Sequence, residues 1–344
     1  MKAAVLHEFK QPLEVEEVPT PKPGAGEVLI KIEASGVCHS DLHLAEGDWP
    51  QLAAIIKLPL ILGHEVVGNV VETGAGVSDL KPGDRVGVAW IHWSCGECEI
   101  CKEGNENLCP SQIITGGTVN GGYAEYIVAK ASHATKVPAG LKSDEAAPLF
   151  CAGVTVYRAV KRAEVKPGQR VAVFGIGGLG HLALQIAQSF GAEVIAVDIT
   201  DEKLDLARSL GADITLNART SDVVKEMRAI GRVHAAIVTS AAKSAYEMAF
   251  ASVRQGGALV VVGLPSEPLC FQAILMAGTE IRIIASAVGT RDDLREVLEL
   301  AEAGKVRCHV ETRPLSQINQ VLDEMRAGRI SGRVVVTALE DGPQ

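Results

Sequence analysis

The sequence predicts an α/β protein with a β-rich domain followed by a domain built on a doubly wound parallel sheet. The length of 344 residues suits two domains, and 47% of the residues are hydrophobic, which is enough for two sizeable cores. After about residue 153, short apolar runs alternate with helical patterns, which is typical of a parallel sheet covered by helices. Before that point, strand-like segments follow one another without long helices between them.

Composition excludes several classes of partner and location. The formal net charge is −9 and no basic cluster is present, so we expect no nucleic-acid partner. The apolar run at residues 52–62 is too short to span a membrane and contains Lys57, so we expect no membrane insertion. The first residues lack the pattern of a secretory signal, and eight cysteines without one favour metal ligation over disulfides. These features predict a cytoplasmic protein.

In the first domain, β-branched and apolar patterns predict short strands separated by loops rich in proline and glycine. The predicted strands are residues 3–6, 14–18, 28–34, 86–88 and 121–128. Ser143 is expected to cap a helix, and residues 149–157 are expected to form one helix that enters the second domain.

Four cysteines lie close together with the spacing C-x2-C-x2-C-x7-C, on a loop rich in glycine and charge. They are Cys95, Cys98, Cys101 and Cys109. This spacing lets four thiolates surround one tetrahedral Zn²⁺, in a closed site that would stabilise the loop. An iron–sulfur cluster is the alternative, because similarly tight cysteine spacings occur there.

A second group of candidate ligands is scattered through the first domain. Cys38, Asp41 and His43 follow a predicted strand, and Gly63-His64-Glu65 comes some twenty residues later. These segments place a thiol, imidazoles and carboxylates in loops at strand ends, where functional sites are commonly built. Taken alone, Cys38 is more often a core residue, so its candidacy depends on the neighbouring groups.

The stretch that organises the second domain runs from Arg170 to Asp198. Residues 171–174 are an apolar β-type run, a helical pattern follows, and residues 194–197 are a second apolar run that ends in Asp198. Between the first strand and the helix stands the motif Gly175-Ile176-Gly177-Gly178-Leu179-Gly180. Strand, glycine turn, helix, strand and acid follow in the order of a dinucleotide-binding fingerprint.

Each part of this motif has a physical role. Gly175 permits a tight turn, Gly177 lets the backbone approach a pyrophosphate, and Gly180 lets helix and strand lie close together. The helix N-terminus attracts the phosphates. Asp198 suits an adenosine ribose and would repel a 2′-phosphate, and the next two residues bring no compensating cation. We therefore expect NAD rather than NADP.

The later segments continue the alternation of strands and helices. Predicted strands are residues 235–238, 258–262, 281–285 and 333–337, and predicted helices are residues 201–208, 244–253, 291–303 and 318–326. Gly256-Gly257 is expected to make a turn between helix and strand. We expect the tail at 333–337 to pack back on the first domain.

Together these residues resemble the zinc-dependent alcohol dehydrogenases of the medium-chain dehydrogenase/reductase superfamily, tetrameric microbial type. The likeness covers nearly the whole chain and rests on six segments, which are residues 38–43, 63–65, the four-cysteine loop, 151–155, the glycine motif and 262–265. The resemblance implies a GroES-like catalytic domain at residues 1–152 and 289–344 and a Rossmann domain at residues 153–288. It further implies two Zn per chain and NAD-dependent oxidation of small primary alcohols to aldehydes, and the reverse.

The family also implies roles for individual side chains of the first domain. Cys38, His64 and Cys151 would hold a catalytic zinc, a ligand set that alcohol dehydrogenase itself exemplifies. Glu65 would sit beside the metal as a transient ligand, and Asp41 would accept the second N–H of His64.

The family implies a proton path and a substrate pocket as well. Ser40 would accept the alcohol proton and pass it through the nicotinamide ribose to His43 and solvent. Trp49 and Trp90 match positions that narrow the pocket in relatives preferring small primary alcohols.

Cofactor contacts are likewise carried over by resemblance. Beyond the glycine motif and Asp198, the matching positions are His39 and Arg333 for the pyrophosphate, Lys203 for the ribose, Thr155 for the nicotinamide, and Val262, Ser286 and Val288 for the carboxamide. His39 is alternatively a solvated loop residue, and Lys203 an ordinary helix lysine. His92-Trp93 departs from the family pattern and, with Cys270 and Cys308, receives no role.

Several alternatives stay open at this point. The same chemistry on a polyol, threonine or an aromatic alcohol is the first. A zinc-free quinone or enoyl reductase of the same fold is the second, although it would have no use for Cys38, His64 and Cys151. A non-catalytic metal- or NAD-binding protein is the third. The resemblance also implies a homotetramer, with a dimer as the alternative, and residues 258–262 and 281–285 are candidates for subunit contacts at a sheet edge.

Overall fold

The computed structural model describes residues 1–337 and divides them into two compact units. The first unit comprises residues 1–151, 290–302 and 308–337, and the second comprises residues 152–289 and 303–307. Residues 338–344, the end of the predicted catalytic domain range, lie outside the described residues. The assignment of catalytic and cofactor-binding roles to these units stays a prediction.

The first unit is β-rich, as expected. Its strands are β1 (Lys2–Leu6), β2 (Glu14–Glu17), β3 (Glu27–Gly36), β4 (Leu60–Ile61), β5 (Glu65–Thr73), β6 (Arg85–Val88), β7 (Ile91–Trp93), β8 (Ile113–Ile114), β9 (Tyr126–Lys130), β10 (Ala134–Lys136), β17 (Val310–Pro314) and β18 (Arg333–Thr337). Its helices are α1 (His39–Glu46), α2 (Pro50–Ala53), α3 (Glu99–Lys102), α4 (Ser143–Ala146), α11 (Arg291–Glu302) and α12 (Ile318–Arg326), and its 3-10 turns are η1 (Glu106–Leu108), η2 (Ala131–His133), η3 (Ala147–Phe150) and η4 (Leu315–Gln317).

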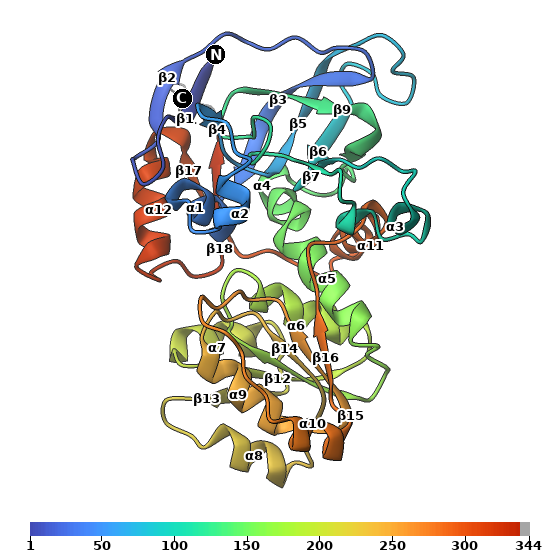
Figure 1. Cartoon of the computed structure of the whole chain (residues 1–344), viewed down its shortest axis with the longest axis vertical. Helices are drawn as coiled ribbons and strands as arrows, with labels where there is room; N and C mark the ends of the chain where they lie inside the picture. Colours follow the sequence, from blue (N-terminus) through green and yellow to red (C-terminus); the bar gives the residue numbers. More distant parts are fainter. Residues whose placement is uncertain (338–344) are drawn as a thin grey trace. The chain divides into compact units, whose positions relative to one another are not determined.

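The largest sheet of this unit follows the order β10-β6-β5-β3-β18-β17, and β9 also pairs with β3. A three-stranded sheet, β2-β1-β4, and the pair β7-β8 complete the strands. The pairing of β18 with β3, with Val335 opposite Gly36, confirms that the tail returns to the first sheet. Helix α12 lies beside α1 (Figure 1), and both bury apolar side chains in one core with β1 and β4.

The second unit contains one parallel sheet with the strand order β13-β12-β11-β14-β15-β16. Its strands are β11 (Arg170–Phe174), β12 (Glu193–Asp198), β13 (Ile214–Asn217), β14 (Val233–Val238), β15 (Val253–Val261) and β16 (Arg282–Ala285). Its helices are α5 (Ala152–Arg162), α6 (Gly180–Ser189), α7 (Asp201–Ser209), α8 (Val223–Ala229), α9 (Lys243–Ser252) and α10 (Ala273–Thr279). The strand order reverses direction between β11 and β14, and doubly wound sheets bind their ligands at such a switch point.

Three local predictions were wrong. The single helix expected at residues 149–157 is broken at Cys151, where the 3-10 turn η3 ends and α5 begins at Ala152. Ser143 is the first residue of α4 and does not cap it, because its hydroxyl hydrogen-bonds to Glu33 across the unit. Gly256-Gly257 lies inside β15, where Gly256 has φ +66° and the register with β14 is irregular, so the expected turn is a local distortion of a strand.

Among the described residues, no helix combines the length and apolar character that crossing a bilayer requires.

Candidate functional site

Four side chains that are far apart in the sequence meet in a buried cluster of the first unit. They are Cys38, His64, Glu65 and Cys151, and their potential ligand atoms all lie within 4.8 Å of one another. The Sγ atom of Cys151 is 3.3 Å from Nε2 of His64 and 3.9 Å from Sγ of Cys38. Two thiols and one imidazole at these distances fit the donor set of a catalytic Zn²⁺ site.

The local structure explains how each ligand atom reaches the cluster. Cys38 stands in extended conformation directly before α1, and His64 and Glu65 stand where β5 begins. Cys151 lies at the break between η3 and α5, where the backbone leaves helical geometry. The interruption of the predicted helix is therefore the feature that brings Cys151 to the cluster.

Asp41 holds the His64 ring in place. Its Oδ1 lies 3.0 Å from Nδ1 of His64, so Nε2 faces the thiols. Its Oδ2 accepts hydrogen bonds from the Tyr123 hydroxyl at 2.7 Å and from the Cys38 amide at 2.9 Å. Asp41, His64 and Tyr123 are fully buried. Burial opposes a charge on His64, but the Asp41 carboxylate outweighs it and raises the pKa of His64 well above its ordinary value.

Sequence reasoning missed Tyr123. Its ring lies against Gly63, where an added Cβ would come within 2.7 Å of the ring and where φ is +95°. Only glycine permits this close approach. The pattern Gly-Gly-Tyr before a strand carried no signal for this role, because nothing in it links Tyr123 to Asp41.

Glu65 forms a buried ion pair with Arg333 from β18. The Arg333 guanidinium Nη2 donates to Oε1 of Glu65, whereas Oε2 has no hydrogen-bond partner among the described residues. Burial raises the pKa of Glu65 to about 7, and the charge of Arg333 opposes this rise. Arg333 is itself 5% exposed. Its predicted contact with a pyrophosphate stays a prediction, since the described contact is with Glu65.

The two thiols of the cluster shift each other's pKa. Their mutual hydrogen bond lowers the pKa of Cys38 well below that of an ordinary thiol and raises the pKa of Cys151. Metal binding needs the deprotonated thiol, so the lowered pKa of Cys38 suits this residue to ligate a cation.

Ser40 and His43 lie three residues apart on α1, the spacing at which helical side chains are neighbours. Nδ1 of His43 is 3.0 Å from Oδ2 of Asp48, and its ring lies 4.9 Å from the ring of Trp49. His43 is half-buried. Asp48, which the sequence did not single out, therefore orients the imidazole that was predicted to release a proton to solvent.

The two tryptophans predicted to line a substrate pocket are both next to predicted site residues. Trp49 contacts His43, and the ring of Trp90 meets His64 edge-on at 4.9 Å. Both are partly buried against the core that contains α1 and β4. Their role in limiting substrate size stays a prediction.

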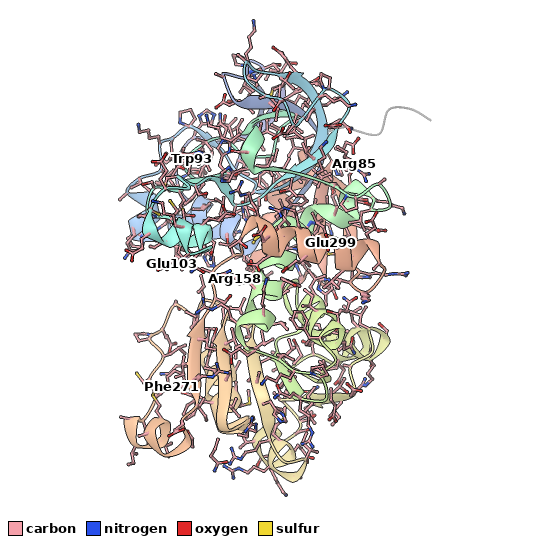
Figure 2. All side chains as sticks on the ribbon, turned by 90° about the vertical axis from the view of Figure 1, so that its right-hand side faces the viewer. Arg85, Trp93, Glu103, Arg158, Phe271 and Glu299 are labelled. Atoms are coloured by element: carbon pink, nitrogen blue, oxygen red, sulfur yellow. The ribbon has the colours of Figure 1, made fainter. Side chains whose placement is uncertain are left out.

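The four-cysteine loop forms a second compact cluster. All four Sγ atoms lie within 4.8 Å of one another, with Cys95 at 3.5 Å from Cys109 and 3.9 Å from Cys101. Glu103, labelled in Figure 2, follows α3 on this loop. Backbone N–H groups of Cys98 and Glu97 lower the pKa of the Cys95 thiol to about 6. Four converging sulfurs fit a closed tetrahedral Zn²⁺ site.

The glycine motif connects β11 to α6 in the second unit. Gly175 has φ +93°, and a Cβ on Gly180 would lie 1.8 Å from the Gly175 carbonyl oxygen. A Cβ on Gly177 would meet nothing within 4 Å, so the backbone there is open to a ligand. Oδ2 of Asp198 accepts a hydrogen bond from the Ile176 amide at 2.6 Å, which ties the end of β12 to the motif.

The remaining predicted cofactor positions are spread over several elements. Thr155 lies on α5, Lys203 on α7, and Val262 directly after β15, while His39 is the exposed first residue of α1 in the other unit. After β16, the Ser286 hydroxyl is buried without a hydrogen-bond partner among the described residues. Val288 has φ +41°, a strained value for a β-branched residue that commonly marks a functional segment. Their cofactor contacts stay predictions.

Comparisons with known proteins cover both units. The family model described as alcohol dehydrogenase GroES-like domain matches residues 24–139, and the model described as zinc-binding dehydrogenase matches residues 178–303. An alcohol dehydrogenase from Geobacillus stearothermophilus is 51% identical over 337 residues, which cover 98% of this chain and 99% of that protein.

Two solved structures share the whole architecture. The alcohol dehydrogenase of Aeropyrum pernix superposes with a TM-score of 0.90 at 37% identity, over 98% of this chain and 100% of that chain. The acetophenone reductase of Geotrichum candidum, solved in complex with NAD, superposes with a TM-score of 0.89 at 35% identity, over 99% and 98% of the two chains. The predicted fold class, a GroES-like domain with a Rossmann domain, is thereby confirmed.

Proposed function

Because the chain belongs to the zinc-binding alcohol dehydrogenase family, we propose that it interconverts small primary alcohols and aldehydes with NAD as the hydride carrier. The observation that carries the proposal is the buried convergence of Cys38, His64 and Cys151, with Asp41 fixing the imidazole. A protein that only bound a dinucleotide would have no use for this cluster.

A bound Zn²⁺ would supply Lewis-acid polarisation of the alcohol oxygen, which lowers the pKa of the hydroxyl. Cys38, His64 and Cys151 would hold the metal, and their two thiolates would balance its charge. Asp41 keeps Nε2 of His64 directed at the cluster. Glu65, buried with one unpartnered oxygen, is close enough to act as a transient fourth ligand.

Ser40 and His43 move the proton in the proposed reaction. Ser40 would accept the proton from the alcohol, and His43 would take it up on its way to solvent. The Asp48 carboxylate accepts a hydrogen bond from Nδ1 of His43. Nε2 of the ring therefore stays available to take up the proton. Because the ring is half-buried, it can release the proton to solvent.

Asp198 sets the preference for NAD in this proposal. Its side chain accepts a hydrogen bond from the Ile176 amide, so the carboxylate is held where the glycine motif begins. A second negative charge from a 2′-phosphate would be repelled there. The four-cysteine loop takes a structural Zn²⁺, so the chain holds two zinc ions.

Small alcohols are the preferred substrates in the proposal because Trp49 and Trp90 stand beside His43 and His64 and occupy volume. The same chemistry on a bulkier alcohol is the second candidate. It is favoured by the similarity to a protein named acetophenone reductase, a name that denotes an aromatic ketone as substrate.

We further propose a cytoplasmic homotetramer. Thiol ligands need the reducing conditions of the cytoplasm. In the second unit, β16 is an edge strand, and three large apolar side chains in the segment that connects β15 to β16 are strongly exposed: Leu264 at 58%, Ile274 at 76% and Leu275 at 48%. Such exposure at a sheet edge favours burial against another copy. Light scattering on the wild type and on Ile274→Glu tests this, and a monomeric wild type would contradict it.

The proposed activity is tested by NAD⁺ reduction against ethanol, butanol, benzyl alcohol, a secondary alcohol and glycerol, with zinc counted per chain. The variants are Cys38→Ser and, as a matched control, the exposed Cys270→Ser. We expect ethanol or butanol to lead, and zinc to fall from about two to about one with activity lost in Cys38→Ser only. Retention of rate and of both zinc ions in Cys38→Ser would refute the catalytic assignment. Oxidation of none of the alcohols by the fully zinc-loaded wild type would refute the substrate class.

A further inference from the structure

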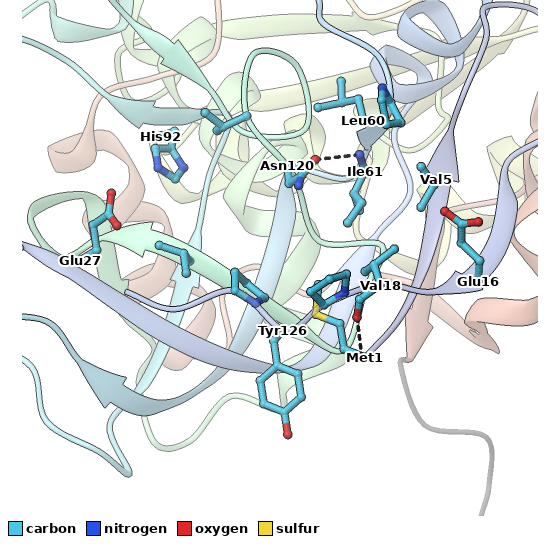
Figure 3. A pocket seen from close by; sticks show the side chains of 15 residues that line it. Met1, Val5, Glu16, Val18, Glu27, Leu60, Ile61, His92, Asn120 and Tyr126 are labelled. Carbon is cyan, nitrogen blue, oxygen red and sulfur yellow. Dashed lines mark hydrogen bonds between the residues drawn. The ribbon is translucent and has the colours of Figure 1, made fainter. Parts of the chain in front are cut away.

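A cavity of about 400 Å³ in the first unit has a mostly aliphatic wall, to which His92 also contributes (Figure 3). Its two carboxylates have partners within the chain, since Glu16 lies 3.1 Å from His7 and Glu27 lies 2.8 Å from Lys130. The glycine motif of the second unit differs from this cavity in one respect. A half-buried backbone donor of the motif, the amide N–H at position 178, has no hydrogen-bond partner among residues 1–337.

This donor belongs to the peptide unit between Gly177 and Gly178. The C=O of Gly177 and the N–H of Gly178 are parts of this one unit, and because a trans peptide is planar they point in opposite directions. Neither of the two residues has a Cβ, so rotation of the unit about the adjoining bonds meets little steric resistance. A contact that fixes the Gly177 carbonyl therefore also fixes the direction of the Gly178 N–H.

His181, the second residue of α6, makes that contact with two hydrogen bonds. Its backbone N–H donates to the Gly177 oxygen at 3.2 Å, and Nδ1 of its ring lies 3.0 Å from the same oxygen. A carbonyl oxygen only accepts, so Nδ1 carries the hydrogen. The side chain of His181 is fully buried, which shields the ring's hydrogen bond from competition with water.

Two other peptide groups of the motif are also fixed by side chains from elsewhere in the second unit. The Thr239 hydroxyl donates to the Gly175 carbonyl oxygen at 2.6 Å, and the Asp198 carboxylate accepts from the Ile176 amide at 2.6 Å. The start of α6 has no side-chain cap hydrogen bond, so its first N–H groups stay available to an anion. With His181, the turn is held by three polar side chains while its remaining donors are left for a ligand.

We propose that His181 is a positioning residue for the cofactor, which fixes the Gly177 carbonyl and thereby directs the Gly178 N–H toward the pyrophosphate of NAD. A Cβ added at Gly177 would meet nothing within 4 Å, so there is space for a phosphate beside this peptide. The inference rests on the proposed use of NAD and adds to it a residue outside the glycine motif. His181 acts through the peptide and does not itself touch the cofactor.

A purely structural role for His181 would have a different signature. An imidazole that only joined α6 to the turn would stabilise the fold, and its loss would change the affinity for every part of the cofactor alike or for none. A positioning role affects only those ligands that carry a pyrophosphate.

The experiment measures the affinities of the zinc-loaded, full-length protein for ADP-ribose and for adenosine, by displacement of bound NADH followed by fluorescence. ADP-ribose contains the pyrophosphate and adenosine does not. His181→Leu removes the ring donor at similar volume. It should weaken ADP-ribose binding by about fivefold, the effect of one neutral hydrogen bond, and change adenosine binding by less than about twofold.

Two further variants separate positioning from packing. His181→Asn should restore most of the ADP-ribose affinity, because its amide nitrogen can take the place of Nδ1 and donate to the Gly177 carbonyl. Gln185→Leu is the matched control. Gln185 is buried one turn further along α6, and its Nε2 donates to the carbonyl oxygens of His181 at 2.8 Å and Arg307 at 2.9 Å. Gln185→Leu should lower the unfolding free energy and leave both affinities unchanged.

A crystal structure of the wild type with ADP-ribose tests the inference without any variant. It should place the Gly178 nitrogen within hydrogen-bond distance of a pyrophosphate oxygen, with the His181 ring still bonded to Gly177. A Gly178 N–H that pointed away from the pyrophosphate would overturn the inference.

The inference is also overturned if His181→Leu weakens both ligands equally or neither, if His181→Asn binds ADP-ribose no better than His181→Leu, or if Gln185→Leu shows the same selective loss. None of these outcomes contradicts the proposed function. A wild type that bound no NADH would refute the proposed cofactor together with the inference.

Discussion

The two sulfur-rich clusters of the first unit are built in opposite ways. The four-cysteine loop collects its ligands within fifteen consecutive residues, from Cys95 to Cys109, on short helical turns. The cluster of Cys38, His64, Glu65 and Cys151 draws on segments more than a hundred residues apart, and three of its four members are buried. A closed site can be a local loop, whereas a reactive site needs surrounding elements to orient each ligand.

The largest expected effect separates the two clusters by their consequences. Cys38→Ser should lower kcat/KM by about 10³-fold, because the polarising cation is lost, while changing the unfolding free energy little. Cys98→Ser should instead lower the unfolding free energy by about 3 kcal/mol or more, because binding of a structural zinc is coupled to folding of the loop. Steady-state kinetics measures kcat/KM, denaturant unfolding measures the unfolding free energy, and zinc counting shows which site each variant has lost. If both variants lost activity and stability equally, the distinction between the clusters would be wrong.

The second-largest effect is expected at Asp41, which orients His64 in the cluster of Cys38, His64, Glu65 and Cys151. Asp41→Asn should weaken zinc affinity at the cluster by about 10- to 100-fold, because the amide no longer holds His64 through a charged acceptor. Competition with a chelator, followed by zinc release, measures this change.

Tyr123→Phe is the matched control. It removes a single hydrogen bond to Asp41, so its effect on affinity should be about tenfold or less. Equal losses in Asp41→Asn and Tyr123→Phe would show that packing, and not the orientation of His64, determines the affinity.

Acid should weaken the elements around the four-cysteine loop in a predictable range. Burial lowers the pKa of His133 to about 4, from an unfolded value near 6.5. Between these two pH values the unfolded chain binds a proton that the folded chain does not bind. The unfolding free energy therefore falls as the pH is lowered from 6.5 to about 4. The loss is at most about 3 kcal/mol. His133 accepts a hydrogen bond from the Ser94 amide, directly before Cys95.

Protonation of Glu106 should also lower the unfolding free energy in acid, over a lower pH range than that of His133. Burial opposes its ionisation, but hydrogen bonds from Arg291 outweigh burial and lower its pKa. Its contribution is present above the unfolded pKa near 4.5 and is lost as the pH falls through the folded pKa.

Denaturant unfolding from pH 7 to pH 4 should be less pH-dependent in His133→Asn than in the wild type. Identical slopes would contradict the assignment.

The smallest effect is expected at Asp48, which orients the His43 ring. Asp48→Asn should lower kcat by about two- to fivefold, because the exposed pair with His43 contributes little energy but orients the ring. A change confined to KM would instead indicate a structural role for Asp48.

Much of the fold could be predicted from local patterns. The run of residues 171–174, the glycine motif and the run that ends at Asp198 became β11, the turn before α6, and β12. Periodicity suffices there because a buried parallel strand and an amphipathic helix each have a distinct repeat. Residues 149–157 show the limit, because their composition suits a continuous helix and only tertiary contacts interrupt it at Cys151.

The sequence by itself determined the two-domain α/β architecture, the dinucleotide motif and the four-cysteine loop, because each depends on residues near one another in the chain. Only the tertiary structure decided that Asp41 would be shared by His64, Cys38 and Tyr123, that Glu65 would be paired with Arg333, and that His92 would line a separate cavity. Those contacts join segments up to 268 residues apart. Their partners are selected by the packing of whole sheets and helices, and no local spacing records that selection.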